Sequence, residues 1–150
     1  MGEEAFALNL ILTVDDKGGL AFNKRRQSRD KSVISDAIKL AERENCKLVC
    51  SQYSIELFDG FDFEPEILSL DEVPMKAYSD LIYFLESQSL ESFVNFDKVI
   101  VYKWNRVYPA DVKVNLDQLL ADFDLEETVE FEGNSHECIT REIWGRKGAK

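Results

Sequence analysis

Residues 80–103 have the sequence DLIYFLESQSLESFVNFDKVIVYK, and this stretch decides the fold. Residues 80–85 are an apolar run of strand length, and residues 98–103 are rich in β-branched and aromatic side chains. Between them, residues 90–96 carry apolar side chains at helix-compatible spacing. Two apolar strands joined by a helix are typical of a parallel pair within a sheet that is covered on both faces.

The turn between the first strand and the helix is Glu86-Ser87-Gln88. In many α/β proteins this turn holds a phosphate on free backbone N–H groups, and that task usually requires glycine. The same residues suit the start of a helix, because Ser87 or Ser89 can cap it and a nearby acid interacts favourably with the helix dipole. We therefore expect a turn with a structural role.

The segments before this stretch continue the alternation of strands and helices. Residues 6–14 (FALNLILTV) are apolar almost throughout and predict a central strand buried on both faces, which ends at the turn 15–19. A helix is predicted from a cap at Asp30 or Ser32 to about Glu44. The following segments are a strand at 47–51, a helical turn at 52–58, a loop at 59–66, a short strand at 67–70 and a turn of helix within 71–79.

The segments after residue 103 predict a different arrangement. Residues 116–123 carry leucines and a phenylalanine at helix spacing, after a weakly alternating segment at 112–114. Residues 127–132 and 136–144 each show strand alternation, which predicts an antiparallel hairpin. The two strands are joined across Gly133-Asn134, and the chain ends in a polar tail at 145–150.

Length and composition suit one domain. The chain has 150 residues, of which 45% are hydrophobic, which is enough for a single core. The predicted fold class is α/β, with a mostly parallel central sheet, flanking helices and a C-terminal antiparallel hairpin, in one domain over residues 1–150.

Charge and cysteine content exclude several function classes. The 18 basic and 29 acidic side chains give a net charge of -11, which disfavours nucleic acid and anionic membranes as partners. The cysteine number is odd and there is one histidine, so neither a disulfide framework nor a zinc site is predicted.

The acidic loop 59–66 lacks calcium-loop spacing, so we expect no metal. The N-terminus has neither a signal peptide nor a membrane anchor, and we expect a cytoplasmic protein.

A basic loop at residues 22–29 leaves two interpretations open. It carries Lys24, Arg25, Arg26 and Arg29. Guanidinium groups bind phosphates and carboxylates bidentately, so the loop could be an anion clamp. It could equally be a solvated loop that balances nearby acids, and we favour this second interpretation.

In its order of elements and hydrophobic pattern, the chain resembles the dihydrofolate reductase family along most of its length. The strand LNLILTV is followed by a turn and by Leu20-Ala21, where the family has an Ile-Gly or Leu-Gly pair. Ser51-Gln52 stand in place of a Gly-Arg pair, and Glu86-Ser87 in place of the paired glycines that receive the cofactor pyrophosphate. The resemblance continues through two later segments, Tyr108-Pro109-Ala110-Asp111 and Asn134-Ser135-His136 leading into ECITREIWGR.

The resemblance implies cofactor-binding positions at Leu20, Ala21, Ser51, Gln52, Glu86 and Ser87. The family's Leu-Pro-Trp segment over the pterin is replaced by residues 25–28 (RRQS). The family carboxylate that holds the pterin corresponds in position to Val33. Asp30 and Asp36 lie one turn either side and are the candidate catalytic carboxylates.

These differences support three function hypotheses. The first is a divergent dihydrofolate reductase-like protein that has lost NADPH binding and acts as a binding or regulatory protein for a small molecule or another protein. The alternative is an active NADPH-dependent reductase of dihydrofolate or a related pterin or pyrimidine, in which Asp30 or Asp36 handles the proton and residues 24–29 bind phosphate. The third is an interaction protein with an acidic surface, motivated by the charge of -11.

Overall fold

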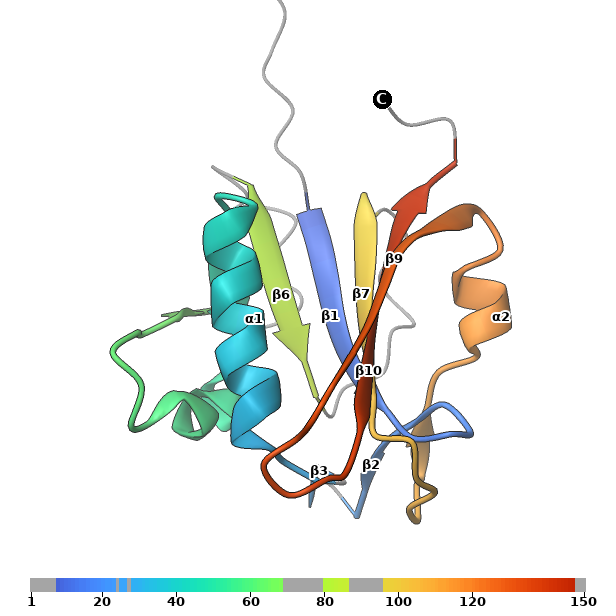
Figure 1. Ribbon diagram of the computed structural model, residues 1–150, viewed down its shortest axis with the longest axis horizontal. Coiled ribbons are helices and arrows are strands. Elements are labelled where there is room, and N and C mark those ends of the chain that lie inside the picture. The colour runs from blue at the N-terminus through green and yellow to red at the C-terminus, as the bar shows by residue number, and fades with distance from the viewer. Residues whose placement is uncertain (1–7, 24, 27, 69–79, 87–95, 148–150) are drawn as a thin grey trace, which may run out of the picture.

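The computed structural model describes residues 8–23, 25–26, 28–68, 80–86 and 96–147. Within them, a seven-stranded sheet has the order β5-β4-β6-β1-β7-β10-β9 (Figure 1). The strands are β1 (Leu8–Val14), β4 (Lys47–Cys50), β5 (Glu66–Ile67), β6 (Leu81–Leu85), β7 (Lys98–Lys103), β9 (Phe123–Phe131) and β10 (Ile139–Arg146).

Strand β1 is the centre of this sheet, and its neighbours β6 and β7 both run parallel to it. Ile11 packs in the core on one face, while Leu10 and Leu12 pack in the core on the other. All three side chains are fully buried. The predicted central strand is therefore confirmed, because apolar residues on both faces are what a doubly covered strand requires.

Helix α1 (Lys31–Arg43) covers the first of these faces (Figure 1). Asp30 caps it, accepting a hydrogen bond from the backbone N–H of Ser32 at 2.8 Å. Its buried stripe of apolar residues packs on β1, β4, β6 and β7. Since these positions recur at helical spacing, the helix was predictable from sequence. The short 3₁₀ helix η1 (Gln52–Phe58) follows β4 at the predicted place.

The C-terminal hairpin forms the antiparallel side of the sheet, with β10 between β7 and β9. The mixed sheet, parallel from β5 to β7 and antiparallel beyond, confirms the predicted fold class. The predicted hairpin boundaries were wrong by a few residues. Residues 136–138 belong to the connecting loop, and residues 145–146, predicted as tail, extend β10. Arg146 donates to the carbonyl oxygen of Phe96 at 2.6 and 2.9 Å, which holds this end of the strand in place.

The second helix was also predicted too long. Helix α2 spans only Leu116–Leu119, and Phe123 begins β9. Leu116, Leu119, Leu120 and Phe123 nevertheless all pack in the same core region, on the face away from α1. The periodicity correctly placed these residues on one side, but tertiary pairing with β10 converts the last of them into a strand.

A second, three-stranded sheet was not predicted. Its order is β3-β2-β8, formed by β2 (Gly19–Phe22), β3 (Arg25–Arg26) and β8 (Val112–Lys113). These strands are two to four residues long, too short for a periodic signal. The predicted basic loop therefore contains a strand.

Two predictions fall on undescribed residues. The turn of helix within 71–79 and most of the helix predicted at 90–96 lie outside the described ranges. Within the described ranges, no helix is long and apolar enough to cross a membrane.

Gly18 offers a test of the turn after β1. It has φ +78°, and a Cβ there would lie 2.4 Å from the carbonyl oxygen of Val114. Gly60 has a similar φ of +89°, but a Cβ there would meet nothing within 4 Å. We expect Gly60→Ala to cost about 1 kcal/mol from backbone strain alone. Gly18→Ala should cost about 2 kcal/mol more, because the backbone must also move. Urea unfolding measures both, and equal costs would contradict the close approach.

Candidate functional site

The carboxyl ends of β1, β4 and β6 lie at one edge of the sheet, because the three strands are parallel. Ligands of open α/β sheets bind outside this edge. The positions predicted to bind a cofactor have different surroundings. Ser51 and Glu86 follow β4 and β6 and are buried, whereas Gln52 is exposed. Leu20 and Ala21 are buried in β2, and Ser87 lies outside the described residues.

Glu86 is engaged in a buried ion pair. Only 3% of it is exposed, and it accepts two hydrogen bonds from Arg26, from Nε at 2.7 Å and from Nη2 at 3.1 Å. The hydroxyl of Ser54 donates to the same carboxylate at 2.7 Å. The bidentate geometry and the third donor satisfy both carboxylate oxygens. The negative charge predicted for this turn is therefore balanced within the protein.

Arg26 is held in this position from η1. Tyr53 contributes its backbone carbonyl, which accepts from Nη2 at 3.2 Å, and its ring, which lies 4.5 Å from the guanidinium carbon. The exposed Glu56 accepts from Nη1 at 3.1 Å.

Burial, together with the negative charge of Glu86, raises the pKa of the Cys50 thiol to about 12. Cys50 is therefore a protonated core residue at neutral pH and an inert one.

A second polar cluster surrounds Asp30 at the start of α1. Besides capping the helix, its carboxylate accepts backbone N–H groups of the β9–β10 loop, from Asn134 and from Ser135, each at 2.7 Å. His136 Nδ1 lies 2.9 Å from Oδ2 of Asp30. Burial opposes ionisation, but the hydrogen bonds from His136 and from the backbone N–H groups outweigh it and hold the pKa of Asp30 well below its ordinary value.

His136 is buried and makes contacts on its other ring nitrogen and on its face. Nε2 lies 3.0 Å from the hydroxyl of Tyr108 and 3.2 Å from the hydroxyl of Ser28. The ring stacks on Trp104 with centroids 4.7 Å apart. The sequence shows that His136 is the sole histidine, but no local pattern links it to Asp30, 106 residues away.

A cavity of about 470 Å³ lies between the start of α1, η1 and the β9–β10 loop. Asp30 is part of its wall. The apolar lining residues are Ile34, Leu57 and Phe61. The charged ones are the cations Arg29 and Lys31 and the acids Glu56 and Asp59, and the uncharged polar ones are Asn134 and Ser135. The cavity therefore offers an apolar surface with polar groups of both charge signs, as small-molecule sites do.

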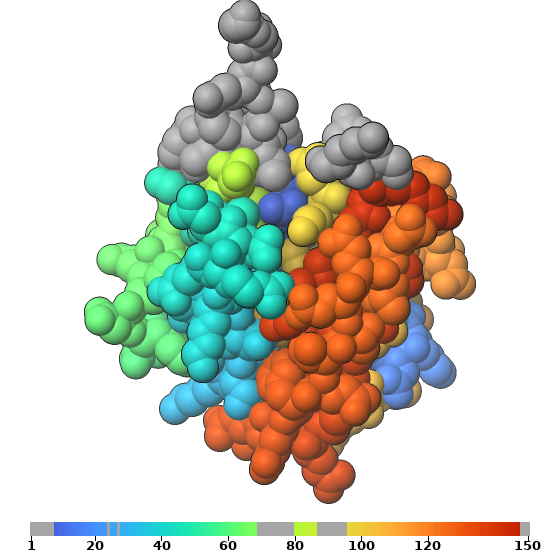
Figure 2. All heavy atoms as spheres, turned by 45° about the horizontal axis from the view of Figure 1, so that its top comes forward, coloured from blue at the N-terminus to red at the C-terminus, as the bar shows by residue number. Residues whose placement is uncertain are grey.

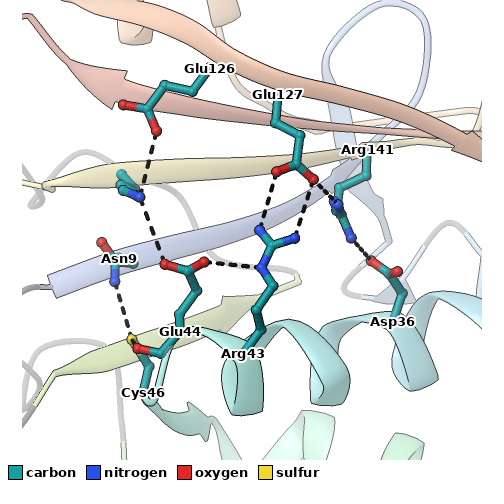
Figure 3. A network of polar contacts seen from close by, with 9 residues as sticks. Asn9, Asp36, Arg43, Glu44, Cys46, Glu126, Glu127 and Arg141 are labelled. Carbon is teal, nitrogen blue, oxygen red and sulfur yellow. Dashed lines mark hydrogen bonds and ion pairs between the residues drawn. The ribbon is translucent and has the colours of Figure 1, made fainter.

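Asp36, the other candidate carboxylate, lies elsewhere. It accepts hydrogen bonds from Tyr102 at 2.7 Å and from Arg141 at 2.6 Å. Arg141 also pairs with Glu127, which pairs with Arg43, so that α1 is joined to β9 and β10 by charges (Figure 3). In the space-filling view, the atoms of α1 and β9 lie next to each other at the surface (Figure 2). Asp36 is not among the residues that line the cavity.

The remaining residues of the predicted site are separated. Val33, which matches the family carboxylate position, is 1% exposed and packs in the core. Of the basic loop, Arg26 pairs with Glu86, Arg29 lines the cavity and Arg25 is exposed, while Lys24 lies outside the described residues. The described arginines therefore point to different surroundings.

No family model matches the chain, and no curated protein matches it in sequence. Among solved structures, it is similar to the dihydrofolate reductase from Enterococcus faecalis complexed with NADP(H) and RAB-propyl. The TM-score is 0.61 at 15% identity, and the match covers 94% of this chain and 96% of the other. The predicted dihydrofolate reductase-like fold is confirmed.

The ion pair of Glu86 predicts an asymmetry between two substitutions. Arg26→Ala should lower the free energy of unfolding by about 3 kcal/mol at pH 7, because it leaves a buried carboxylate without its counter-charge. Glu56→Ala, which removes the exposed partner of the same guanidinium, should cost less than about 1 kcal/mol. Urea unfolding compares them, and costs within 0.5 kcal/mol of each other would be inconsistent with a buried pair.

The lowered pKa of Asp30 predicts a pH dependence of stability. A carboxylate with a depressed folded-state pKa contributes stability in full above its unfolded-state pKa of about 4, and this contribution is lost as the pH falls further. We expect Asp30→Asn to cost about 3 kcal/mol at pH 7 and progressively less from pH 4 to pH 2. Asp62→Asn, at an exposed position, should follow the wild-type profile. A penalty for Asp30→Asn that stays constant down to pH 2 would contradict the assignment.

Proposed function

We propose that the chain is a binding protein built on the dihydrofolate reductase fold, without NADPH-dependent reductase activity. The observation that carries the proposal is the ion pair of Glu86 with Arg26 at the carboxyl end of β6. In the family that the chain resembles, the turn after this strand receives the pyrophosphate of the cofactor. Here a buried carboxylate begins that turn, and a guanidinium and a serine hydroxyl already satisfy it.

The electrostatics of Glu86 support loss of the nucleotide. A pyrophosphate needs close access to backbone N–H groups, which paired glycines allow and side chains obstruct. If Arg26 moved to the phosphate, Glu86 would remain as an unpaired charge nearby. Two like charges at 4 Å repel by about 4 kcal/mol at an effective dielectric of 20, which is roughly a thousandfold in affinity. Binding of NADPH would therefore either break the Arg26–Glu86 ion pair or meet repulsion between Glu86 and the phosphates.

The cavity beside Asp30 supports a remaining role in binding. Ile34, Leu57 and Phe61 give it apolar walls, and Asn134 gives it an amide. A small molecule with a flat apolar body and a few polar groups fits these surroundings. The donors around Asp30 keep it ionised and occupy its carboxylate, which is fully buried, so a ligand would meet the other polar groups of the cavity wall. The reductase alternative needs a carboxyl group that can give up a proton, so the same donors favour binding over reduction.

NADPH titration and a reductase assay test the proposal together. With 1 mM NADPH we expect no rise in melting temperature, and with added dihydrofolate no absorbance loss at 340 nm above background. A ligand at one hundred times its dissociation constant would add about 2.7 kcal/mol, or roughly 8 °C for a chain of this size. A shift of that size, or turnover on the order of 1 per second, would overturn the proposal.

A matched pair of variants tests the reason for the loss. Glu86→Gln removes the buried carboxylate and frees Arg26 toward the site, so NADPH should bind at least tenfold more tightly than to the wild type. Glu56→Gln removes the exposed partner of Arg26 and leaves the Glu86 pair intact. It should bind NADPH as weakly as the wild type. Equal binding by the two variants would show that Glu86 is not what excludes the nucleotide.

A further inference from the structure

Ser28, His136 and Asp30 form a connected row of side chains outside the Arg26–Glu86 region. The hydroxyl of Ser28 lies 3.2 Å from Nε2 of His136, and Nδ1 of His136 lies 2.9 Å from Oδ2 of Asp30. Both distances are within the range expected between a nucleophile, a base and the group that orients the base. The order hydroxyl, imidazole, carboxylate is that of a Ser-His-Asp triad, which is recognised by geometry and not by sequence position.

The surroundings of Asp30 determine which nitrogen of His136 carries the proton. Asp30 accepts from three backbone N–H groups and from the hydroxyl of Ser135 at 3.1 Å, so it is an acceptor on every side. An ionised carboxylate has no proton to donate, so Asp30 must also accept a hydrogen bond from His136. In the neutral imidazole the proton therefore resides on Nδ1, the nitrogen that faces Asp30. Nε2 is left with a free lone pair, and it faces two hydroxyl groups. This is the tautomer that a general base requires.

The imidazole is also held rigidly. It is 5% exposed, it stacks on Trp104 at an interplanar angle of 21°, and its Nδ1 side is fixed to the start of α1. A base on a fixed ring does not lose rotamer freedom when it accepts a proton. Ser28, by contrast, is only half-buried. The row therefore runs from a buried carboxylate to a residue that is partly exposed to solvent.

Tyr108 adds a second hydroxyl at the same nitrogen, at 3.0 Å. Nε2 has one lone pair and accepts one hydrogen bond fully, so either hydroxyl can donate to it. When Ser28 donates, the phenol of Tyr108 is free to donate to a neighbouring oxygen. Such a donor can stabilise negative charge that develops on a carbonyl oxygen.

The cavity of about 470 Å³ lies next to this row: Asp30, Ser135 and Arg29, the residue after Ser28, line it, whereas Ser28 and His136 do not. The acyl group of a substrate would occupy the apolar surface of this cavity. We propose that Ser28 is a nucleophile, activated by His136 and oriented through Asp30, that hydrolyses small carboxylic esters. This inference does not depend on whether NADPH binds.

The reaction balances without a cofactor. Ser28 Oγ attacks the ester carbonyl carbon as its proton passes to His136 Nε2, and the C–O bond to the alcohol breaks as His136 returns that proton to the leaving oxygen. Water then attacks the acyl-serine with His136 again as base, which releases the acid and restores the hydroxyl. The overall change is ester plus water to acid plus alcohol.

Covalent labelling of the full chain tests the nucleophile. We expect a fluorophosphonate probe to modify Ser28, located by peptide mass spectrometry, and p-nitrophenyl acetate to be hydrolysed above the background rate. Ser28→Ala should lose the label and lower the hydrolysis rate about 100-fold. Ser35→Ala, at a half-buried serine of α1, should change the rate less than twofold. Folded wild-type protein that carries no label on Ser28 would overturn the proposal.

Two further variants separate positioning from structural support. Asp30→Asn should lower kcat for p-nitrophenyl acetate with KM nearly unchanged, measured where circular dichroism shows the variant to be folded. Tyr108→Phe removes the second hydroxyl at Nε2 and should lower kcat for p-nitrophenyl acetate, because the donor to the carbonyl oxygen is lost. Unchanged kcat in folded Tyr108→Phe, or in folded Asp30→Asn, would count against the assigned roles.

Discussion

The carboxylate of Asp30 joins three parts of the chain that are distant in sequence. It caps α1, holds the β9–β10 loop through the backbone of Asn134 and Ser135, and orients His136. The buried carboxylate of Asp30 thus forms part of the cavity wall, holds the loop of the hairpin and positions the imidazole of His136. A buried carboxylate is stable only when nearly all of its acceptor sites are used, and here the backbone supplies most of the donors. The arrangement of the polar groups at this end of the molecule depends on that one set of hydrogen bonds.

The other charged residues of α1 and β6 contribute to structure in a different way. Asp36 and Arg141 connect α1 to the hairpin, and Arg43 continues that network with Glu127 (Figure 3). Arg141 is mostly buried, so its neighbours act as a cross-link between the helix and the antiparallel strands. The Arg26–Glu86 pair does the same between the small sheet and the main one. Of the basic loop that suggested anion binding, Arg26 is therefore neutralised within the fold.

A shared fold does not carry a shared activity. The likeness to a dihydrofolate reductase at 15% identity concerns the path of the backbone, and it extends over nearly the whole chain. At the edge where β4 and β6 end, the described carboxylate of Glu86 is already hydrogen-bonded to Arg26 and Ser54. Around His136, by contrast, two hydroxyls face one ring nitrogen. Chemistry at this end of the molecule is best sought there.

The sequence by itself determined the parallel core, α1 and the existence of the hairpin, because each depends on a local period of apolar residues. It also identified Asp30 and Asp36 as candidates, but not which one lines the cavity. Six helical positions rotate a side chain by about 240°, so the two carboxylates face different neighbours. Only the tertiary structure decided that Asp30 meets His136 and that Glu86 meets Arg26, across 106 and 60 residues. Such pairs form when sheet pairing brings loops together, and no local pattern records them.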